Sequence, residues 1–321
     1  MKWFECKVLS RRTWLVHAFS TRVGTASRRP VGNWNLGFTP GARRARVEQN
    51  RRAFFRGLRA NGFLLAEVRQ IHSALAYRVT RGEGNGLEYL PCGYPPPSKN
   101  RGDLPQGDAL MTNEPGILLA VRSADCVPVF LADPENRAVA AIHAGWKGML
   151  EGIVEKTVGE MRRIFGTQPR SVLAAIGPCI RACCYEVGEE VESAFCGRFP
   201  NGEAFFPKPA HEKGLVDRNR YPPSFLSMAP PGHGPDPTRR PHLDLVAAAR
   251  YQLQRSGLRA PNIRTGDLCT SCHTNLFFSY RKEGSRTGRM MAVIGVRPIE
   301  RPRNLRVETP MRASAGRRAT V

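Results

Sequence analysis

The sequence predicts a single α/β (α+β) domain in which layered, mixed β-sheets are flanked by helices. Short apolar runs with the length of buried strands are interspersed with amphipathic helical stretches. Their order does not follow the regular strand–helix alternation of a doubly wound sheet. We find no internal repeat and no glycine-rich turn that opens a helix after a strand, which argues against a dinucleotide-binding fold. We expect one domain over residues 1–300, followed by a basic, flexible tail over residues 301–321.

The strand predictions depend on five short apolar runs, which are GILLAVRS (116–123), VPVFLAD (127–133), AVAAIHAG (138–145), SVLAAIGP (171–178) and MAVIGV (291–296). Residues 148–165 instead have a helical period, with one apolar face made of Met149, Ile153, Val154, Thr157, Val158 and Met161. A second helix is predicted within residues 243–258, where Gly257 is typical of a helix C-terminus. Residues 91–107 and 207–241 are rich in proline and are expected to be surface loops.

Composition limits the function classes. No apolar stretch is long enough to span a bilayer and the N-terminus does not resemble a signal peptide, so we expect a cytoplasmic protein without membrane contact. The nine cysteines are then expected to be free thiols or metal ligands. The net charge of +22 is spread over scattered residues without an aromatic RNA-binding motif, which favours a solvated, arginine-rich surface over nucleic-acid binding.

A cysteine and a histidine are predicted to meet at one end of a hairpin. The runs 127–133 and 138–145 are joined by the turn-like PENR, and Cys126 precedes the first run while His143 ends the second. Such a pair could be a nucleophile with its base, or with another imidazole it could hold a metal through three ligands. From these residues alone, simple packing of a buried Cys and His is the favoured interpretation.

Several motifs across the chain resemble the YfiH/YlmD family, whose members have been called laccase-domain polyphenol oxidases, purine nucleoside phosphorylases and peptidoglycan editing factors. The motifs are STRVG, NWNLG, EQNRR, QIHSA, GDALMT, ADCVPV, AIHAGWKG, AIGPCI with CCYEVGEEV, HLDL, and CTSC with FFSYRKEG and TGRMMAVIG. The family's metal ligands correspond to His72, Cys126 and His143. The resemblance implies a four-layer α/β fold and a zinc enzyme that performs phosphorolysis or deamination of adenosine-type nucleosides.

The resemblance leads us to expect a zinc-dependent purine nucleoside phosphorylase acting on adenosine, inosine or methylthioadenosine, with copper as the alternative metal. Its partners would be a nucleoside and phosphate, and the chain would be a monomer or a weak homodimer. Two departures from the family pattern, at Val23-Gly24 and Trp34, leave the shape of the pocket less certain than its metal site.

Further residues are candidates for binding and catalysis. Arg51 matches a family pocket arginine and is predicted to bind phosphate, although a surface helix arginine explains it equally well. Asn35 could bind sugar hydroxyls or cap a turn, and Arg22 and Lys147 are weaker anion candidates. Asp125 could order water or fix a ligand histidine, as could Asp108; for each of these carboxylates, a structural turn role is at least as favoured.

Two rival activities remain open. Cys126 and His143 could form the nucleophile and base of a hydrolase that edits a peptidoglycan precursor. A copper polyphenol oxidase is harder to build, because seven histidines without an H-x-H motif cannot also form a trinuclear centre. Zinc-deaminase motifs are missing as well, since no histidine is followed by x-Glu.

The other cysteines are predicted to be structural. Cys269 and Cys272 form a lone CxxC that lacks the second half of a zinc ribbon, and haem attachment at CTSCH would require export. Cys179, Cys183 and Cys184 could form a soft-metal patch, but packing is the favoured interpretation.

Overall fold

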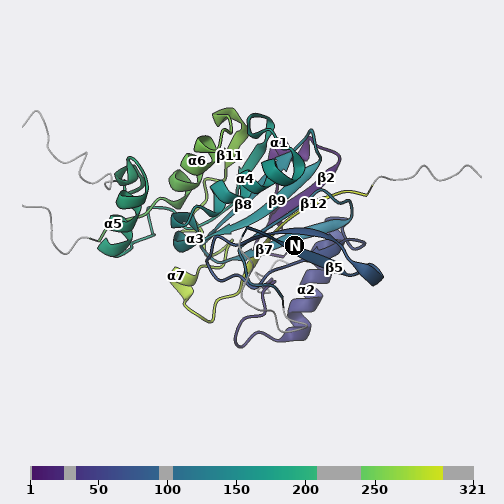
Figure 1. Ribbon diagram of the computed structural model, residues 1–321. Helices are drawn as coiled ribbons and strands as arrows, with labels where there is room; N and C mark the ends of the chain where they lie inside the picture. Colours follow the sequence, from purple (N-terminus) through teal and green to yellow (C-terminus); the bar gives the residue numbers. More distant parts are fainter. Residues whose placement is uncertain (1, 25–33, 94–103, 208–239, 299–321) are drawn as a thin grey trace, which may run out of the picture.

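The structure is a computed structural model that describes residues 2–24, 34–93, 104–207 and 240–298 (Figure 1). Most of the two proline-rich stretches and all of the predicted basic tail lie outside these residues. Within them, no helix is both long and apolar enough to cross a bilayer. The strands form two mixed sheets, as the sequence predicts.

The two sheets differ in size and supply the two inner layers. The five-stranded sheet has the order β1 (Trp3–Phe4), β2 (Leu15–Ser20), β12 (Met290–Val296), β7 (Ile117–Ser123) and β3 (Leu64–Ala66). The seven-stranded sheet has the order β11 (Ile263–Thr265), β10 (Leu173–Ile176), β8 (Val127–Asp133), β9 (Ala138–Ala144), β6 (Ala109–Thr112), β4 (Ala76–Arg81) and β5 (Leu87–Cys92). All five predicted strands are present, within a few residues of their expected bounds.

Strand β8 shows why the core strands are continuously apolar. Every residue of β8 is buried, because one face packs on helices and the other on the second sheet. Phe130 points to the second sheet, where its ring stacks on Phe19 with centroids 4.4 Å apart. Phe130 is fully buried, so its replacement by alanine would cost about 3–5 kcal/mol of folding free energy.

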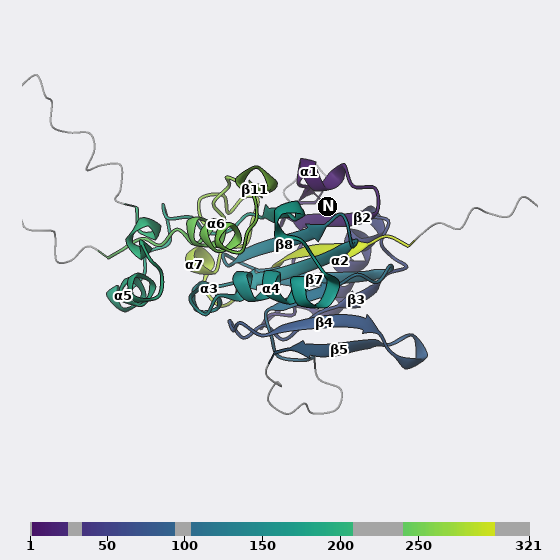
Figure 2. The same cartoon turned by 45° about the horizontal axis from the view of Figure 1, so that its top comes forward.

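Helices form the outer layers, which gives the four layers that the family resemblance implies (Figures 1 and 2). Their bounds are α1 (Lys7–Ser10), α2 (Arg44–Gly57), α3 (Trp146–Leu150), α4 (Ile153–Phe165), α5 (Glu189–Arg198), α6 (Leu245–Arg255) and α7 (Tyr280–Glu283). The described part of the chain also contains the 3-10 turns Glu83–Asn85, Pro169–Ser171, Gly202–Phe205 and Ala260–Asn262. Apolar side chains of α4 and α6 pack on the seven-stranded sheet, and those of α2 pack on the five-stranded sheet.

The two predicted helices are confirmed, with one correction. The apolar face predicted for residues 148–165 is buried throughout, but the stretch is two helices rather than one. Gly152 between α3 and α4 has a left-handed backbone (φ 78°), which a continuous helix does not contain. Helix α6 begins at the Asp244 cap, whose carboxylate accepts from two backbone amides, and Gly257 follows its end with a positive φ.

Candidate metal centre and substrate cavity

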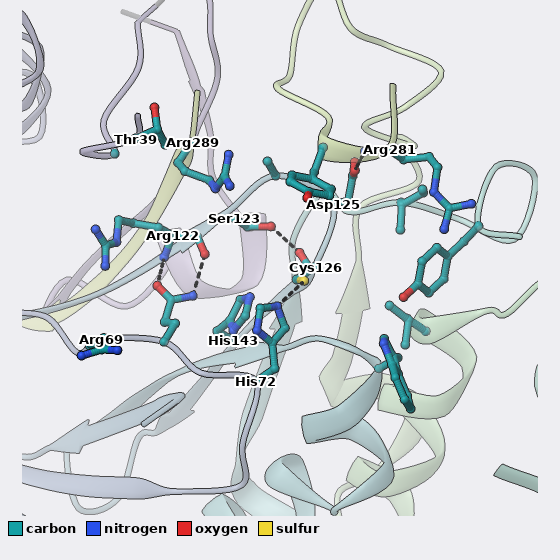
Figure 3. Close-up of a pocket in the computed structure, with 18 of the residues that line it drawn as sticks. Thr39, Arg69, His72, Arg122, Ser123, Asp125, Cys126, His143, Arg281 and Arg289 are labelled. Carbon is teal, nitrogen blue, oxygen red and sulfur yellow. Dashed lines mark hydrogen bonds between the residues drawn. The ribbon is translucent and has the colours of Figure 1, made fainter. Parts of the chain in front are cut away.

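The predicted meeting of Cys126 and His143 is confirmed. Strands β8 and β9 are an antiparallel pair in which Val127 lies opposite Ala144 and Pro128 opposite His143. Cys126 is the residue directly before β8, so its thiol reaches the same end of the sheet as His143. The third predicted ligand, His72, comes from the segment between β3 and β4, and its Nε2 lies 3.7 Å from the Cys126 sulfur (Figure 3). The ligand atoms of all three residues lie within 4.8 Å of one another.

Asp108 organises both histidines from behind. Its fully buried carboxylate accepts a 2.8 Å hydrogen bond from His143 Nδ1, which leaves the Nε2 of that ring free to bind a metal. The same carboxylate accepts the backbone N–H groups of Ile71, His72 and Ser73. These bonds hold His72 in a left-handed backbone conformation with φ of 61°. Asp108 therefore fixes two candidate ligands on different segments, which is one of the roles open to it from the sequence beside a structural turn role.

Two neighbours keep the ligands close together. Gln70 donates to the carbonyl of Arg122 and accepts from its N–H, at 2.7 and 2.8 Å, which ties the His72 segment to the end of β7 (Figure 3). Gly145 follows β9, where a Cβ atom would come within 2.5 Å of His72 and 3.2 Å of the Cys126 sulfur. Only glycine leaves room for this approach. The glutamine of QIHSA and the glycine of HAGW thus have physical reasons to stand beside the ligands.

The three side chains also set one another's protonation. Burial raises the pKa of the Cys126 thiol, but interactions with His143 and His72 outweigh burial and bring that pKa down to about 6. Burial lowers the pKa of His143, but Cys126 and Asp108 outweigh it and raise that pKa to about 9. Both shifts favour a thiolate beside an imidazolium when no metal is bound. A thiolate is the form that binds metals and acts as a nucleophile.

The three candidate ligands line a cavity of about 730 Å³, a volume within the usual range of small-molecule sites. Four arginines line it as well: Arg69, Arg122, Arg281 and Arg289. Arg69, Arg122 and Arg289 lie on one side of Cys126 and Arg281 on the other (Figure 3). The aromatic rings of Trp146, Tyr185 and Tyr280 complete the lining. None of these arginines or rings was singled out from the sequence, in which 49 lysines and arginines give no local signal for a pocket.

The predicted anion-binding residues lie elsewhere. Arg51 is not among the described residues that line this cavity. Its guanidinium donates to both carboxylate oxygens of Glu67, at 2.7 and 3.0 Å, and to the carbonyl of Leu36. It also stacks behind the cavity residue Phe38, 4.6 Å from the ring centroid. Arg51 is thus neither a surface helix arginine nor a cavity-lining one, and its predicted phosphate contact would require a change of partners.

The other three candidates also lie outside the lining. Arg22 pairs with Glu283 at 2.6 Å and donates to two backbone carbonyls. Lys147 is exposed, with its ammonium 5.5 Å from the Trp146 ring centroid. Asn35 accepts the backbone N–H groups of Gly37 and Arg289 through its Oδ1. Asn35 therefore positions the backbone of one cavity arginine, which is closer to the turn role than to direct sugar binding.

Asp125 lines the cavity, but its carboxylate is already engaged. Thr270 Oγ1, Ser279 Oγ and the backbone N–H of Arg281 donate to it at 2.6, 3.1 and 2.7 Å. These contacts attach the segment after β11 to the residue beside Cys126. Its predicted catalytic role stays a prediction, and what the structure shows is a positioning contact.

Comparison with known proteins gives concordant similarities. Residues 16–297 match the family model described as multi-copper polyphenol oxidoreductase laccase. The chain is 31% identical over 287 residues to a purine nucleoside phosphorylase of Bacteroides thetaiotaomicron, covering 89% of this chain and 93% of the relative. It is 34% identical over 284 residues to a purine nucleoside phosphorylase of Deinococcus radiodurans, covering 87% and 88%.

Solved structures show the same similarity in three dimensions. The crystal structure of YlmD from Geobacillus stearothermophilus superposes with a TM-score of 0.71 at 29% identity, covering 93% of this chain and 97% of that one. The hypothetical protein YfiH of Bacillus licheniformis gives a TM-score of 0.69 at 28% identity, covering 88% and 93%. The layered fold described above is therefore shared across nearly the whole length.

Proposed function

The chain belongs to the laccase-domain family that includes YfiH and YlmD, and we propose that it is a purine nucleoside phosphorylase with a catalytic zinc. The observation that carries this proposal is the joint placement of His72, Cys126 and His143 at a cavity lined by four arginines. A metal site alone would suit many reactions, but the added positive charge favours an anionic second substrate. The relatives named purine nucleoside phosphorylase support the same reaction.

The donor set fits zinc. Two imidazoles and one thiolate are ligands that zinc accepts, and three protein ligands with one open position is its usual catalytic arrangement. The 3.7 Å between the Cys126 sulfur and His72 Nε2 approximates the separation of two ligands on one tetrahedral zinc, about 3.5 Å. A zinc ion there would supply a Lewis acid beside the substrate. Asp108 would keep His143 in the tautomer that binds it.

Phosphorolysis transfers the sugar from base to phosphate. A phosphate oxygen forms a bond to C1′ of the ribose as the bond from C1′ to the purine nitrogen breaks, and the bonding electrons leave with the base. Arg69, Arg122 and Arg289 are grouped on one side of Cys126, where guanidinium groups can hold the phosphate dianion in place (Figure 3). We assign the anion site to these residues, in place of the Arg51 site expected from the sequence.

Aromatic residues suit the nucleoside. Tyr185 and Trp146 line the cavity, and the Arg281 guanidinium lies 5.2 Å from the Tyr185 ring centroid. A purine can stack on such rings, which recognises its flat surface rather than its substituents. This favours a site that accepts adenosine, inosine and methylthioadenosine alike. Deamination of adenosine remains part of the proposal as a side activity, because the same bound nucleoside would be its substrate.

One observation favours a second candidate, a hydrolase. The low pKa of Cys126, about 6, and the adjacent His143 are what a nucleophilic cysteine and its base require. In the metal-free protein, the Cys126 thiolate could therefore attack an acyl carbon, such as that of a peptidoglycan precursor, and form a thioester as the amine leaves with a proton from His143. Water would then hydrolyse the thioester and return the thiol. For a copper polyphenol oxidase, the described residues provide just two His/Cys groups able to hold a metal, and the second contains no histidine. This argues against a trinuclear copper centre in the described part of the chain.

The test is to incubate zinc-loaded protein with adenosine, or with inosine, in the presence and absence of phosphate. We expect free purine and ribose 1-phosphate in equal amounts, dependent on phosphate, by chromatography and ³¹P NMR. Cys196→Ser, which changes an exposed cysteine on α5, is the matched control and should behave like the wild type. Free base without ribose 1-phosphate would indicate hydrolysis, and inosine from adenosine would indicate deamination. Unchanged nucleosides would overturn the proposal.

A further inference from the structure

Four cysteines from two distant segments meet in a second cluster. Cys183 and Cys184 follow β10, and Cys269 and Cys272 follow β11. Their sulfur atoms all lie within 4.8 Å of one another. The Cys272 sulfur is 3.5 Å from that of Cys183 and 3.3 Å from that of Cys184. The CxxC motif that lacks a partner in the sequence therefore finds one in the adjacent pair Cys183-Cys184.

Backbone contacts hold the two segments at this spacing. Cys179 and Cys269 form an isolated parallel bridge, in which the N–H of Thr270 donates to the Cys179 carbonyl at 3.0 Å. The N–H of Arg181 donates to the Cys269 sulfur at 3.4 Å. A tight turn, in which the N–H of Cys184 donates to the Arg181 carbonyl, then brings the adjacent cysteines back toward Cys272. The cluster is thus built by the fold rather than by chance proximity of mobile side chains.

Sulfur–sulfur distances and side-chain exposure distinguish three interpretations of the four-cysteine cluster. A disulfide would join two sulfurs at about 2.05 Å, well below the 3.3 Å observed. Packing as small apolar residues does not explain the cluster, since Cys183 and Cys272 are exposed. A tetrahedral zinc with Zn–S bonds of about 2.3 Å holds its sulfurs about 3.8 Å apart. The observed separations approximate this value.

We propose that Cys183, Cys184, Cys269 and Cys272 bind a second zinc ion in a closed, structural site. Four protein ligands leave no open position, which is the arrangement of structural rather than catalytic zinc. Binding would convert the four thiols to thiolates and release their protons to solvent. This inference does not depend on the proposed phosphorylase activity.

The site would also hold one wall of the substrate cavity. Ile180 and Tyr185, on the first cysteine segment, line the cavity, as does Arg281 beyond the second. Asp125 links the two segments to the catalytic end of β8, because its carbonyl accepts from Ile180 and its carboxylate from Thr270. A zinc between the segments would fix these wall residues relative to Cys126. The cysteines themselves would have a positioning role.

The first test is metal content, measured by mass spectrometry of the purified full chain. We expect two zinc ions per wild-type chain and one each in Cys272→Ser and Cys126→Ser. The double variant should retain none, and the control Cys196→Ser should retain two. A Cys272→Ser protein with the same zinc content as the wild type would overturn the proposal, and so would iron in place of zinc.

A second measurement uses the unmodified chain and so avoids any folding defect of a variant. Native protein is treated with N-ethylmaleimide before and after zinc removal by a chelator, and labelled cysteines are identified by peptide mass spectrometry. We expect Cys183, Cys184, Cys269 and Cys272 to be protected until the chelator is added. Equal labelling under both conditions would show that no metal covers these sulfurs. An unlabelled pair with an intact mass lower by two hydrogens would show a disulfide instead.

Discussion

The two sulfur-containing clusters of this protein differ in composition and in surroundings. His72, Cys126 and His143 offer three ligands at a cavity of about 730 Å³, and Asp108 holds the imidazole of His143 and the backbone of His72. The four-cysteine cluster offers four ligands, and backbone contacts between loops fix it. An open coordination position beside a cavity suits catalysis, whereas a filled coordination shell between two loops suits stability. The comparison assigns one cluster to the reaction and the other to the shape of the site.

The largest expected difference between the two clusters is in the phosphorolysis activity that remains when one cysteine of each is replaced. Cys126→Ser should lower kcat/KM for phosphorolysis by about 1000-fold or more, because a hydroxyl holds zinc poorly and the Lewis acid contributes several kcal/mol. Cys272→Ser should lower it by less than about tenfold, since it disturbs the cavity wall and not the reacting atoms. Its melting temperature should fall, by about 2–4 °C for each kcal/mol lost. Steady-state kinetics and thermal unfolding of both variants give the measurement; equal losses of activity would remove the distinction between the clusters.

The same comparison shows what the sequence can predict. The meeting of Cys126 and His143 follows from a short hairpin, whose register a four-residue turn nearly determines. His72 has no such local relation to the pair, and only the family resemblance included it. Cys183 and Cys272 are 89 positions apart, and the loops that carry them meet through tertiary contacts outside any hairpin. The sequence therefore predicts the first cluster and leaves the second divided between two unrelated motifs.

Arginines illustrate the same limit. Helix α2 places Arg51 toward Glu67, whose carboxylate accepts two hydrogen bonds from the guanidinium. The family motif instead predicted that this guanidinium would bind phosphate. Arg122 lies at the end of β7, in a strand predicted correctly, but its entry into the cavity depends on how the two sheets and the Gln70 loop pack. Element type was thus predictable, whereas the direction of a long charged side chain was not.

The second prediction concerns phosphate, which should bind beside His72, Cys126 and His143 and not at the four-cysteine cluster. Arg122→Ala should raise the KM for phosphate by roughly 10- to 150-fold, because a charge-assisted hydrogen bond contributes about 1.5–3 kcal/mol. Zinc content should stay at the wild-type value. Arg51→Ala is the comparison, and we expect it to change the phosphate KM by less than about threefold while lowering the melting temperature. Glu67 would lose its bidentate partner and keep only the longer, 3.7 Å contact with Arg122. The reverse ranking in phosphate titrations would restore the assignment made from the sequence.

The third prediction separates the clusters by metal affinity. Asp108→Asn removes the charge that holds His143 while keeping the side-chain volume, and changes to such partners typically cost 10- to 100-fold in affinity. We expect the chelator to remove the zinc ion at His72, Cys126 and His143 more readily than in the wild type. The ion at the four cysteines should compete as in the wild type, because Asp108 belongs to the other site. Unchanged competition curves for both ions would show that the Asp108 contacts do not tune the metal.

The smallest expected difference is in thiol reactivity of the metal-free protein. The imidazole partners lower the pKa of Cys126 to about 6, whereas a hydrogen bond with Cys184 raises that of Cys272 to about 11. Alkylation of Cys126 should therefore lose rate as the pH falls through about 6, while that of Cys272 should still be rising at pH 9. At pH 7 the thiolate fraction of Cys126 should therefore exceed that of an ordinary thiol.

Its lower basicity also reduces the intrinsic nucleophilicity of Cys126, which offsets much of this advantage over a free thiol such as glutathione. The pH midpoint is consequently more informative than the rate itself. Iodoacetamide labelling followed by peptide mass spectrometry from pH 5 to 10 brackets the midpoint of Cys126 and shows whether labelling of Cys272 is still rising at the upper end. A midpoint near 8.5 for Cys126 would mean that the thiolate–imidazolium pair does not form without metal. The hydrolase alternative would then lose the observation that favours it, whereas the zinc site would keep its geometric support.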